Sequence, residues 1–337
     1  VCAEVCPPKA IDYEQQDEVV RVETGAVILA PGFCLYDPVE KPEYSCGLAP
    51  NVLSSLQFER LLSASGPCMG NVVRPSDGKV PKRIAFVQCV GSRDEAHEWC
   101  SSVCCMYSLK EAIIAREHEH DVECTLFYMD IRAHGKGFDA YYERAKELGI
   151  RFVRCRPSRI DELESKSLRV GFVPEDDGGA DGAAARAGST GAPGAYRTED
   201  FDLVVLASGL EPPAEARAMA GKFGIELDAN RFGASPAFNP VASSRPGVFL
   251  AGPFSEPKDI PETVVEASSA AAEAMTLLAE RRGTLVTKVD LPAETDIAGQ
   301  VPRIGVFVCH CGKNIGAYVD VPAVREYANS LPFVVFA

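Results

Sequence analysis

The sequence PKRIAFVQCVGSRDEAHEWCSSVCCMYSLKEAIIA, residues 81–115, predicts a buried strand, a loop and a helix in succession. Ile84–Val87 is a short run of the apolar residues that fill the strands of parallel sheets. From Ser101 to His118 the apolar residues recur at helical spacing. A strand that passes through a loop into a helix is the repeating unit of α/β folds.

The same alternation of strand and helix continues along the chain. Short apolar runs predict further buried strands at 26–30, 124–128, 203–207 and 248–251. Helical composition without internal Gly or Pro predicts helices at 138–148 and 262–282. Strands that alternate with helices indicate an α/β fold with a parallel sheet.

Composition narrows the classes of protein to which the chain can belong. With 337 residues it is long enough for roughly two domains, each with its own core. Its net charge of −14 at pH 7 is unsuited to binding phosphate backbones, so nucleic acid is not an expected partner. No apolar stretch approaches the roughly 18 to 20 residues that cross a bilayer, so we expect a soluble protein without a membrane span.

Cysteine usage points to metal binding in a reducing compartment. The chain has 13 cysteines, an odd number, and they are clustered rather than spread as disulfide partners. We therefore expect a cytoplasmic location. The first residue is Val1, inside what resembles a ligand run, so we also expect a part of the protein upstream of it.

Four cysteines, Cys89, Cys100, Cys104 and Cys105, lie close together in the strand–loop–helix segment. Cys89 ends the strand, at the carboxyl edge where α/β sheets place their ligands. We predict that Cys100 and Cys104 lie one turn apart on one face of the helix, whose N-terminus favours thiolate charge. A 4Fe-4S cluster fits this set best, because zinc sites rarely use adjacent cysteines; zinc and inert buried thiols are the alternatives.

Two more cysteine pairs are candidate metal ligands. Cys2 and Cys6, followed by Pro7, match the last two ligands of the ferredoxin run C-x2-C-x2-C-x3-C-P. The alternative is a turn with two unrelated thiols. Cys309 and Cys311 form C-x-C-G after an apolar run, where they would serve as ligands or as a redox pair.

Three segments carry the pattern with which two-dinucleotide flavoproteins surround their flavin. GVFLAGP at 247–253 predicts a strand that ends in a Gly-Pro turn, and a helix follows from Ile260. In such proteins this turn delivers the helix N-terminus to the isoalloxazine ring, where N–H groups stabilise negative charge. GAVILAPGF at 25–33 and LVVLASGLEP at 203–212 resemble the internal strand-and-turn motif. Taken singly, each segment also fits an ordinary buried strand.

Several longer motifs resemble one family. They are PNVLSSLQFERLLSASGP at 50–67, RPSDGKVPKRIAFVQCVGSRDE at 74–95, CSSVCCMYSLKEA at 100–112, FYMDIRAHGKGFDAYYERAKELGIRFVR at 127–154 and GVFLAGPFSEPKDIPETVVEASSAAAEA at 247–274. Together they resemble the A subunit of heterodisulfide reductase, the flavin and iron-sulfur component found in methanogens and sulfate reducers. The resemblance covers nearly the whole chain. Its tail, 303–320, resembles the start of that family's N-terminal domain, as in a tandem copy or a fusion.

The resemblance implies a thioredoxin-reductase-like, two-dinucleotide-binding flavoprotein fold of the α/β class, with a ferredoxin-like remnant at the N-terminus. It implies an oxidoreductase component that uses FAD and 4Fe-4S clusters to relay electrons in a heterodisulfide reductase-type complex, with flavin-based electron bifurcation as an open option. The implied partners are disulfide-reducing subunits and an electron donor of the hydrogenase, formate dehydrogenase or ferredoxin type.

The resemblance also implies roles for single residues. The family's four-cysteine set corresponds to Cys89, Cys100, Cys104 and Cys105, which would be the cluster ligands. The implied flavin contacts are Pro31, Gly32, Gly252, Pro253, Lys258, Asp259, Ile260, Pro261, Glu262 and Thr263.

Lys110, five residues after Cys105, is a candidate to reach the flavin and tune its potential by charge. The alternative is a solvated helix lysine. Relatives that use NAD(P)H have G-x-G-x-x-G where this chain has Cys-Val-Gly-Ser-Arg-Asp at 89–94, so we expect no direct hydride transfer from NADH.

Two departures from the family pattern bear on flavin binding. The first FAD fingerprint, G-x-G-x-x-G, and the first ferredoxin ligands would lie upstream of Val1, so we expect weak or no FAD binding by this chain alone. Glu256 stands where the family often has Gly before Pro-Lys-Asp-Ile, which opposes a close approach of backbone to flavin there.

The predicted organisation has six parts, within which a Gly- and Asp-rich stretch at 174–195 predicts a mobile surface loop. The parts are the end of a ferredoxin-like insertion at 1–18, an FAD-domain segment at 19–80, a pyridine-nucleotide-domain-like region with the cluster at 81–212, a return to the FAD domain at 213–283, a linker at 284–302 and the start of a further βαβ domain at 303–337.

Three other interpretations stay open. A component of a quinone-interacting oxidoreductase of sulfate respiration would share the fold but would have membrane-anchored partners. An NAD(P)H-dependent disulfide oxidoreductase would need a glycine fingerprint together with a redox C-x2-C or C-x4-C motif, and the sequence has no G-x-G-x-x-G. A zinc-bound scaffold would be a colourless protein.

Overall fold

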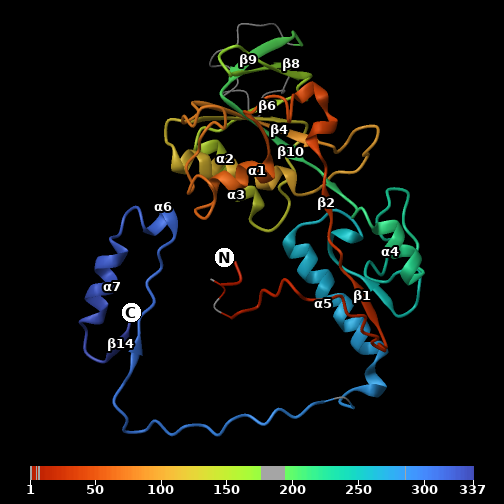
Figure 1. The fold of residues 1–337 in the computed structure, drawn as a ribbon. Helices are drawn as coiled ribbons and strands as arrows, with labels where there is room; N and C mark the ends of the chain where they lie inside the picture. The colour runs from red at the N-terminus through yellow and green to blue at the C-terminus, as the bar shows by residue number, and fades with distance from the viewer. Residues whose placement is uncertain (1, 5, 7, 176–193, 285) are drawn as a thin grey trace.

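The computed structural model describes residues 2–4, 6, 8–175, 194–284 and 286–337. Figure 1 shows them as an upper body built on a large sheet, a lower body around helix α5 (Ile260–Leu277) and a C-terminal unit. Residues 176–193 of the predicted loop lie outside the described part, as do residues 1, 5, 7 and 285.

A five-stranded parallel sheet forms the centre of the upper body. Its strands lie in the order β3-β10-β4-β5-β6. On β4, Phe86 lies opposite Leu126 of β5 and Val205 of β10, and all three side chains are buried. Both faces of the sheet are covered, which is why the sequence shows continuous apolar runs. The strands are β3 (Val52–Ser54), β4 (Arg83–Val90), β5 (Glu123–Tyr128), β6 (Arg151–Arg154) and β10 (Leu203–Ser208).

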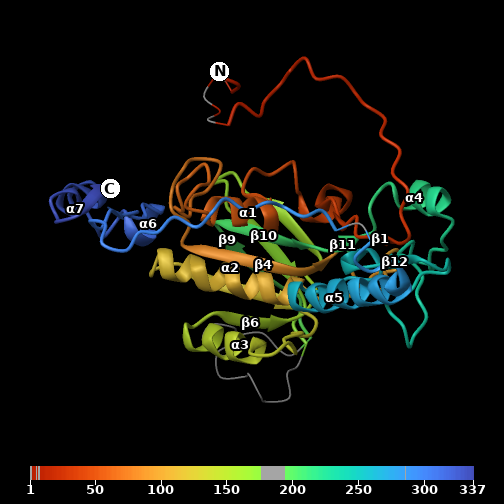
Figure 2. The same ribbon diagram turned by 90° about the horizontal axis from the view of Figure 1, so that it is seen from below.

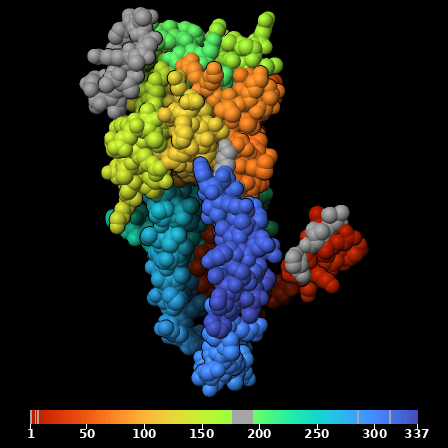
Figure 3. Space-filling view, turned by 90° about the vertical axis from the view of Figure 1, so that its left-hand side faces the viewer, coloured from red at the N-terminus to blue at the C-terminus, as the bar shows by residue number. Residues whose placement is uncertain are grey.

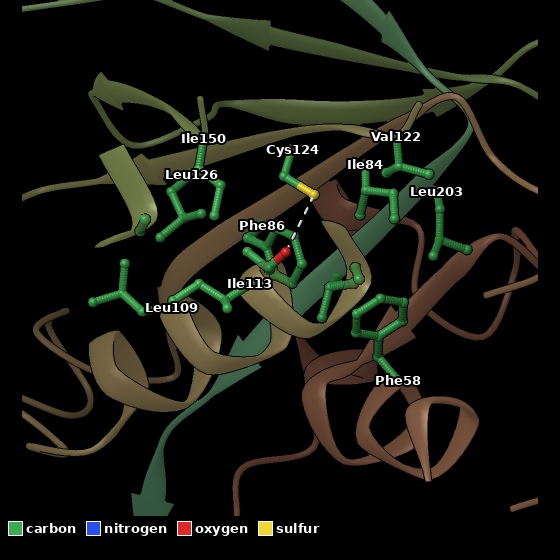
Figure 4. Close-up of a cluster of buried hydrophobic side chains, with 14 of the residues drawn as sticks. Phe58, Ile84, Phe86, Leu109, Ile113, Val122, Cys124, Leu126, Ile150 and Leu203 are labelled. Carbon is green, nitrogen blue, oxygen red and sulfur yellow. Dashed lines mark hydrogen bonds between the residues drawn. The ribbon is translucent and has the colours of Figure 1, made fainter. Parts of the chain in front are cut away.

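Three helices, α1 (Ser55–Leu62), α2 (Cys104–His118) and α3 (Phe138–Glu147), pack on one face of this sheet. Figure 4 shows the core between them, where Phe58 of α1 and Leu109 of α2 meet the inward side chains of the sheet. Cys124 belongs to this core, and its thiol donates to a carbonyl of α2 at 3.9 Å. It is therefore a packing residue, as a thiol in the middle of a strand predicts.

An antiparallel sheet covers the opposite face. It consists of β7 (Arg159–Glu162), β8 (Leu168–Phe172) and β9 (Arg197–Phe201) in sequence order. Phe127 of the parallel sheet packs between Phe172 and Phe201 of this layer, with ring centroids 4.9 and 5.8 Å away. Two 3-10 turns, η1 (Pro38–Glu40) and η2 (Pro42–Tyr44), complete the covering.

The lower body holds a second, smaller parallel pair, β1 (Val27–Leu29) with β12 (Val248–Leu250). Two separate clusters of buried side chains surround it, one on the side of α4 (Ala216–Phe223) and one on the side of α5. The turn η3 (Gly252–Phe254) follows β12 directly, and η4 (Ala279–Arg281) follows α5. This body therefore has its own core.

Two short strands connect the bodies. β2 (Cys34–Leu35) and β11 (Leu210–Glu211) pair antiparallel, and Figure 1 shows β2 running between the upper and the lower body. The chain passes upward through β2 and downward through β11. The pair is thus a candidate hinge.

The two ends of the chain lie outside these bodies. Figure 3 shows the N-terminal residues, in red, standing away from the rest, and residues 8–25 are exposed throughout. In the C-terminal unit, β13 (Ile304–Gly305) and β14 (Val334–Phe336) pair in parallel, with α6 (Gly312–Ile315) and α7 (Val321–Asn329) between them.

The predicted fold class is confirmed: the chain is α/β, with two parallel sheets arranged as in a two-dinucleotide-binding flavoprotein. That the large sheet is the pyridine-nucleotide half and the small one the flavin half stays a prediction. Among the described helices, none combines the length and the apolar composition needed to cross a bilayer.

Candidate functional site

The four clustered cysteines converge at the carboxyl edge of the large sheet. Cys89 lies at the end of β4, Cys104 and Cys105 open α2, and all three are buried. Cys100 is half-buried in the loop between β4 and α2. The edge of the sheet therefore presents four free thiols from three segments of the chain.

One predicted detail is wrong: Cys100 does not lie on the helix. α2 begins only at Cys104, and Cys100 precedes it in an irregular loop. Ser102 has a φ of 62°, a left-handed conformation that a helix cannot contain, so the chain turns sharply there. The sequence pattern could not reveal this turn because serine gives no special signal for a positive φ.

Two of the thiols donate hydrogen bonds to backbone carbonyls at the ends of strands. The Cys104 thiol donates to the carbonyl of Ser208, at the end of β10, at 3.8 Å. The Cys105 thiol donates to the carbonyl of Asp130, just beyond β5, at 3.6 Å. These long contacts to carbonyls show that the site lies across the ends of neighbouring strands.

Burial raises the pKa of three of these thiols. It raises the pKa of Cys105 to about 11 and the pKa of Cys104 further. Burial also raises the pKa of Cys89, although the guanidinium of Arg93 opposes that effect. Cys89, Cys104 and Cys105 are therefore neutral thiols until a cation displaces their protons.

The donor set is chemically suited to iron or zinc but is not closed around one point. Across the described residues, no group of three or more His, Cys, Asp and Glu side chains is arranged to hold a metal ion. Binding would require these thiols to lose their protons and turn inward.

Strained backbone shapes the loop after β4. Cys89 has a φ of 59° and Arg93 a φ of 57°, and Gly91 between them has a φ of 71°. The carbonyl of Cys89 accepts a hydrogen bond from the guanidinium of Arg156 at 3.1 Å, and that of Arg93 accepts one from the same group at 3.4 Å. Non-glycine residues with positive φ persist only where their surroundings hold them, which is common at functional sites.

The predicted flavin-contact residues come together at one edge of the small sheet. Because β1 and β12 are parallel, Pro31-Gly32 after β1 and Gly252-Pro253 after β12 leave the sheet on the same side. Gly252 has a φ of 73°, and a Cβ there would lie 3.2 Å from a methyl group of Thr263 on α5. The turn therefore needs glycine to bring β12 close to the start of α5.

Asp259 and Glu262 are bonded to each other's backbone at the start of α5. Asp259 accepts from the N–H of Glu262 at 2.8 Å, and Glu262 accepts from the N–H of Asp259 at 3.0 Å. This capping box, with Pro261 in the first turn, fixes where the helix begins. Ile260 and Thr263 follow on the same first turn, and Ile260 is exposed.

Lys258 is buried, with 5% of its surface exposed, and its ammonium is already paired. It donates to the carboxylate of Glu266, in the second turn of α5, and to the hydroxyl of Ser255 at 2.8 Å. Sequence reasoning missed Glu266, because an apolar and alanine-rich helix gave no signal that its one inward carboxylate was the partner of a lysine.

A cavity of about 670 Å³ lies at the start of α5, and its wall extends to Ser102 in the loop that carries Cys100. Ser102, just ahead of α2, lies on its wall, and so do Lys258 and Asp259, just ahead of α5. Figure 2 shows α2 and α5 end to end, and the cavity lies where their N-termini meet. Arg132 and His134, in the loop after β5, complete the wall.

The size of this cavity suits an aromatic ring. Its volume is within the range of roughly 300–1,000 Å³ common for small-molecule sites. The N-terminus of α5 and the basic loop at 132–136 face it, and so do four carboxylates, those of Glu256, Asp259, Glu262 and Glu266. A larger hollow of about 940 Å³ lies at the other end of α5, around Met275 and Leu278, but it is lined by none of the predicted site residues that the structure describes.

The structure does not bring Lys110 to this cavity. Its ammonium forms an ion pair with Glu59 of α1 at 2.8 Å, and both side chains are more than two-fifths exposed. Lys110 is not among the described residues that line the cavity. Its role toward a flavin therefore stays a prediction.

The remaining candidate cysteines lie on separate segments. Cys2 is exposed and Cys6 half-buried in the N-terminal segment that stands away from the body. Cys309 and Cys311 precede α6, and a hydrogen bond with Cys309 is the main cause that raises the pKa of Cys311. The two thiols of this pair are thus neighbours.

No protein-family model matches the chain. It is 42% identical over 279 residues to the A subunit of the H2:CoB-CoM heterodisulfide,ferredoxin reductase of Methanothermobacter thermautotrophicus, covering 81% of this chain and 40% of that protein. It is 45% identical over 276 residues to the second of the iron-sulfur A subunits of CoB–CoM heterodisulfide reductase in Methanopyrus kandleri, covering 80% and 40%. To the corresponding protein of Methanocaldococcus jannaschii it is 35% identical over 328 residues, covering 95% and 47%.

The chain thus spans less than half the length of these curated relatives. Among solved structures it is similar to a thioredoxin reductase of T. acidophilum, with a TM-score of 0.45 and 15% identity, over 74% of this chain and 65% of that one.

Proposed function

Because this chain belongs, over about four fifths of its length, to the family of the heterodisulfide reductase A subunit, we propose that it is an electron-relay part of an oxidoreductase that acts on sulfur groups. The observation that supports the proposal most directly is the cavity between the N-termini of α2 and α5. Its wall includes Ser102, which lies between Cys100 and Cys104 in the sequence, and Lys258, Asp259, Pro261 and Glu262 of the predicted flavin contacts; none of the four cysteines lines it.

Cys89, Cys100, Cys104 and Cys105 would hold a 4Fe-4S cluster, which when bound accepts and donates single electrons. These residues suit such a group because they supply four thiols at the positive end of a helix, next to the guanidinium of Arg93. Their burial also excludes water from the site, which protects an oxidisable centre.

FAD would place its ring in the cavity, and when bound it would exchange electrons with the cluster and with a two-electron partner. The first turn of α5 would face the ring, and the turns at 31–32 and 252–253 leave the small sheet together on the same side. Lys258 and Glu266, which form an ion pair on this wall, would hold its shape around the ring. Part of the FAD site would come from outside this chain.

The loop between β4 and α2 argues against NAD(P)H as the direct donor. Its residues 89–103 hold two of the four thiols and no glycine fingerprint, so no pyrophosphate cradle forms at the start of α2. We propose that electrons enter and leave through other redox centres.

The partners follow from the relatives' names as proposals. Those names mention hydrogen, formate and ferredoxin alongside the CoB-CoM heterodisulfide. We propose that this chain works with disulfide-reducing subunits and with a donor of the hydrogenase, formate dehydrogenase or ferredoxin type, in the cytoplasm.

Iron and acid-labile sulfide content of the full chain, purified without oxygen, tests the proposal. We expect Cys104→Ala to lose about four iron and four sulfide per chain, together with a reduced-state EPR signal. Cys124→Ala is the matched control, because this thiol is equally buried but lies in the core between β5 and α2. Zinc in place of iron, or equal iron in the two variants, would overturn the cluster assignment.

A further inference from the structure

The loop segment 97–101, which carries Cys100, is bound along the connecting strand β11 by alternate residues. The indole N–H of Trp99 donates to the carbonyl of Leu210 at 2.9 Å. The hydroxyl of Ser101 accepts from the N–H of the same residue at 2.7 Å. Two residues before Trp99, a ring nitrogen of His97 lies 2.9 Å from the carboxylate of Glu211.

These contacts hold the backbone on both sides of Cys100. His97, Trp99 and Ser101 all contact β11, and the chain bends at Trp99. The Cys100 thiol itself accepts a hydrogen bond from the N–H of Ser102 at 3.3 Å. Its position therefore depends on the loop backbone that its neighbours fix, since Cys100 precedes α2.

The start of the loop, just after β4, packs tightly against Gly209, which precedes β11. The hydroxyls of Ser92 and Ser101 are hydrogen-bonded to each other, and the N–H of Gly209 donates to the carbonyl of Val90 at 2.8 Å. A Cβ on Gly209 would lie 2.5 Å from the Ser92 hydroxyl and 2.9 Å from that of Ser101. The loop and the strand connection therefore cannot shift independently.

Trp99 also reaches the lower body. Its ring lies edge-on to Phe232, with centroids 5.4 Å apart, and Phe232 is fully buried beyond β11. On the other side, the ring of His97 meets both Trp99 and Tyr36, the residue after β2, with centroids 5.1 and 5.2 Å away. A row of four rings, each edge-on to the next, thus runs from the upper body across both connecting strands.

We propose that Trp99 and His97 are positioning residues that orient Cys100 and tie its position to the orientation of the lower body. The inference rests on the proposed function insofar as Cys100 is a cluster ligand. It goes beyond that function, because it makes the hinge strands part of the electron-transfer site. A rotation of the α5 body about β2 and β11 would pull on Trp99 and displace the Cys100 thiol.

The first experiment needs no cluster. The rate at which iodoacetamide alkylates Cys100 is measured by peptide mass spectrometry in the reduced, metal-free full chain, relative to the exposed Cys34. We expect Trp99→Phe, which keeps a ring but loses the N–H donor, to raise the Cys100 rate about fivefold, the population shift expected from one lost neutral hydrogen bond. His97→Ala should act in the same direction.

Glu98→Gln is the matched control, because Glu98 lies in the same segment but is exposed. Phe232→Leu tests the tie to the lower body: it should raise the Cys100 rate although it lies beyond β11. Trp99 is the one tryptophan of the sequence, so its fluorescence emission reports directly whether its surroundings change in this variant.

A Cys100 rate in Trp99→Phe that stays within twofold of Glu98→Gln would overturn the positioning role. A rise in Trp99→Phe without one in Phe232→Leu would overturn the tie to the lower body. After reconstitution, Trp99→Phe should retain the iron content of the wild type with an altered EPR line shape. A wild type that takes up no iron would contradict the proposed function, while the alkylation rates would still decide the positioning role.

Discussion

Lys258 and Glu266 form an ion pair at the start of α5 that is almost fully removed from solvent, with side-chain exposures of 4% and 12%. The other carboxylate oxygen of Glu266 accepts from the N–H of Gly252 at 2.8 Å. The Glu266 carboxylate therefore links the turn after β12 and Lys258, which precedes the helix, to the helix itself. This arrangement holds the wall of the cavity in a fixed shape.

Replacing Lys258 by Met should destabilise the chain by roughly 3 kcal/mol, because it leaves a carboxylate buried without its counter-charge. The free energy of unfolding, from urea titration followed by circular dichroism, measures the loss. Adding Glu266→Gln to this variant should restore part of it, since a neutral amide still accepts from Gly252. If the single variant is as stable as the wild type, the pair contributes no net stability.

Gly209→Ala should lower the free energy of unfolding by about 1–3 kcal/mol. The added Cβ would lie 2.6 Å from the backbone carbonyl of Gly91, which cannot move aside without breaking the loop. Gly221→Ala, on α4, is the control. No atom lies within 4 Å of its Cβ position, and alanine favours the helix, so this change should be neutral or slightly stabilising. Both are compared by urea unfolding; equal stabilities would contradict the close packing around Gly209.

Glu111 should make the chain less stable as the pH rises. Burial, aided by repulsion from Glu59, raises the pKa of this α2 carboxyl well above its usual value. Below the unfolded pKa both states are protonated and nothing changes; above it the unfolded state ionises while the folded state keeps its proton, which favours unfolding. Glu111→Gln should therefore match the wild type near pH 4 and exceed it at pH 8. A constant difference between the two across this range would show that burial does not control this carboxyl.

Glu199 should make the chain less stable as the pH falls. Although burial raises its pKa, bonds from Arg151 and the charge of Arg83 outweigh that effect and lower it. A lowered folded pKa gives stability that is present above the unfolded pKa and lost as the pH falls through the folded value. Glu199→Gln should thus reduce stability at pH 7 but flatten its loss on acidification. Thermal unfolding between pH 3 and 7 checks this, and parallel curves for variant and wild type would refute it.

The predictions from sequence succeeded where local patterns carry the information. Ile84–Val87 and the other apolar runs became strands of parallel sheets, and Cys89 lies at the carboxyl edge of its strand. The helix predicted from Ile260 begins there, with Asp259 and Glu262 as its capping box, while their role as flavin contacts stays a prediction. The placement of Cys100 on a helix failed, because a left-handed turn at Ser102 delays the helix to Cys104.

The sequence by itself determined the α/β class, the family and the four thiols, because periodicity, turn residues and motif spacing are local properties of a chain. Only the tertiary structure decided that α2 and α5 meet N-terminus to N-terminus at one cavity, and that Trp99 and His97 bind along β11. Those relationships join residues more than a hundred positions apart, and they depend on how two separate cores pack about the connecting strands. No local spacing encodes that packing.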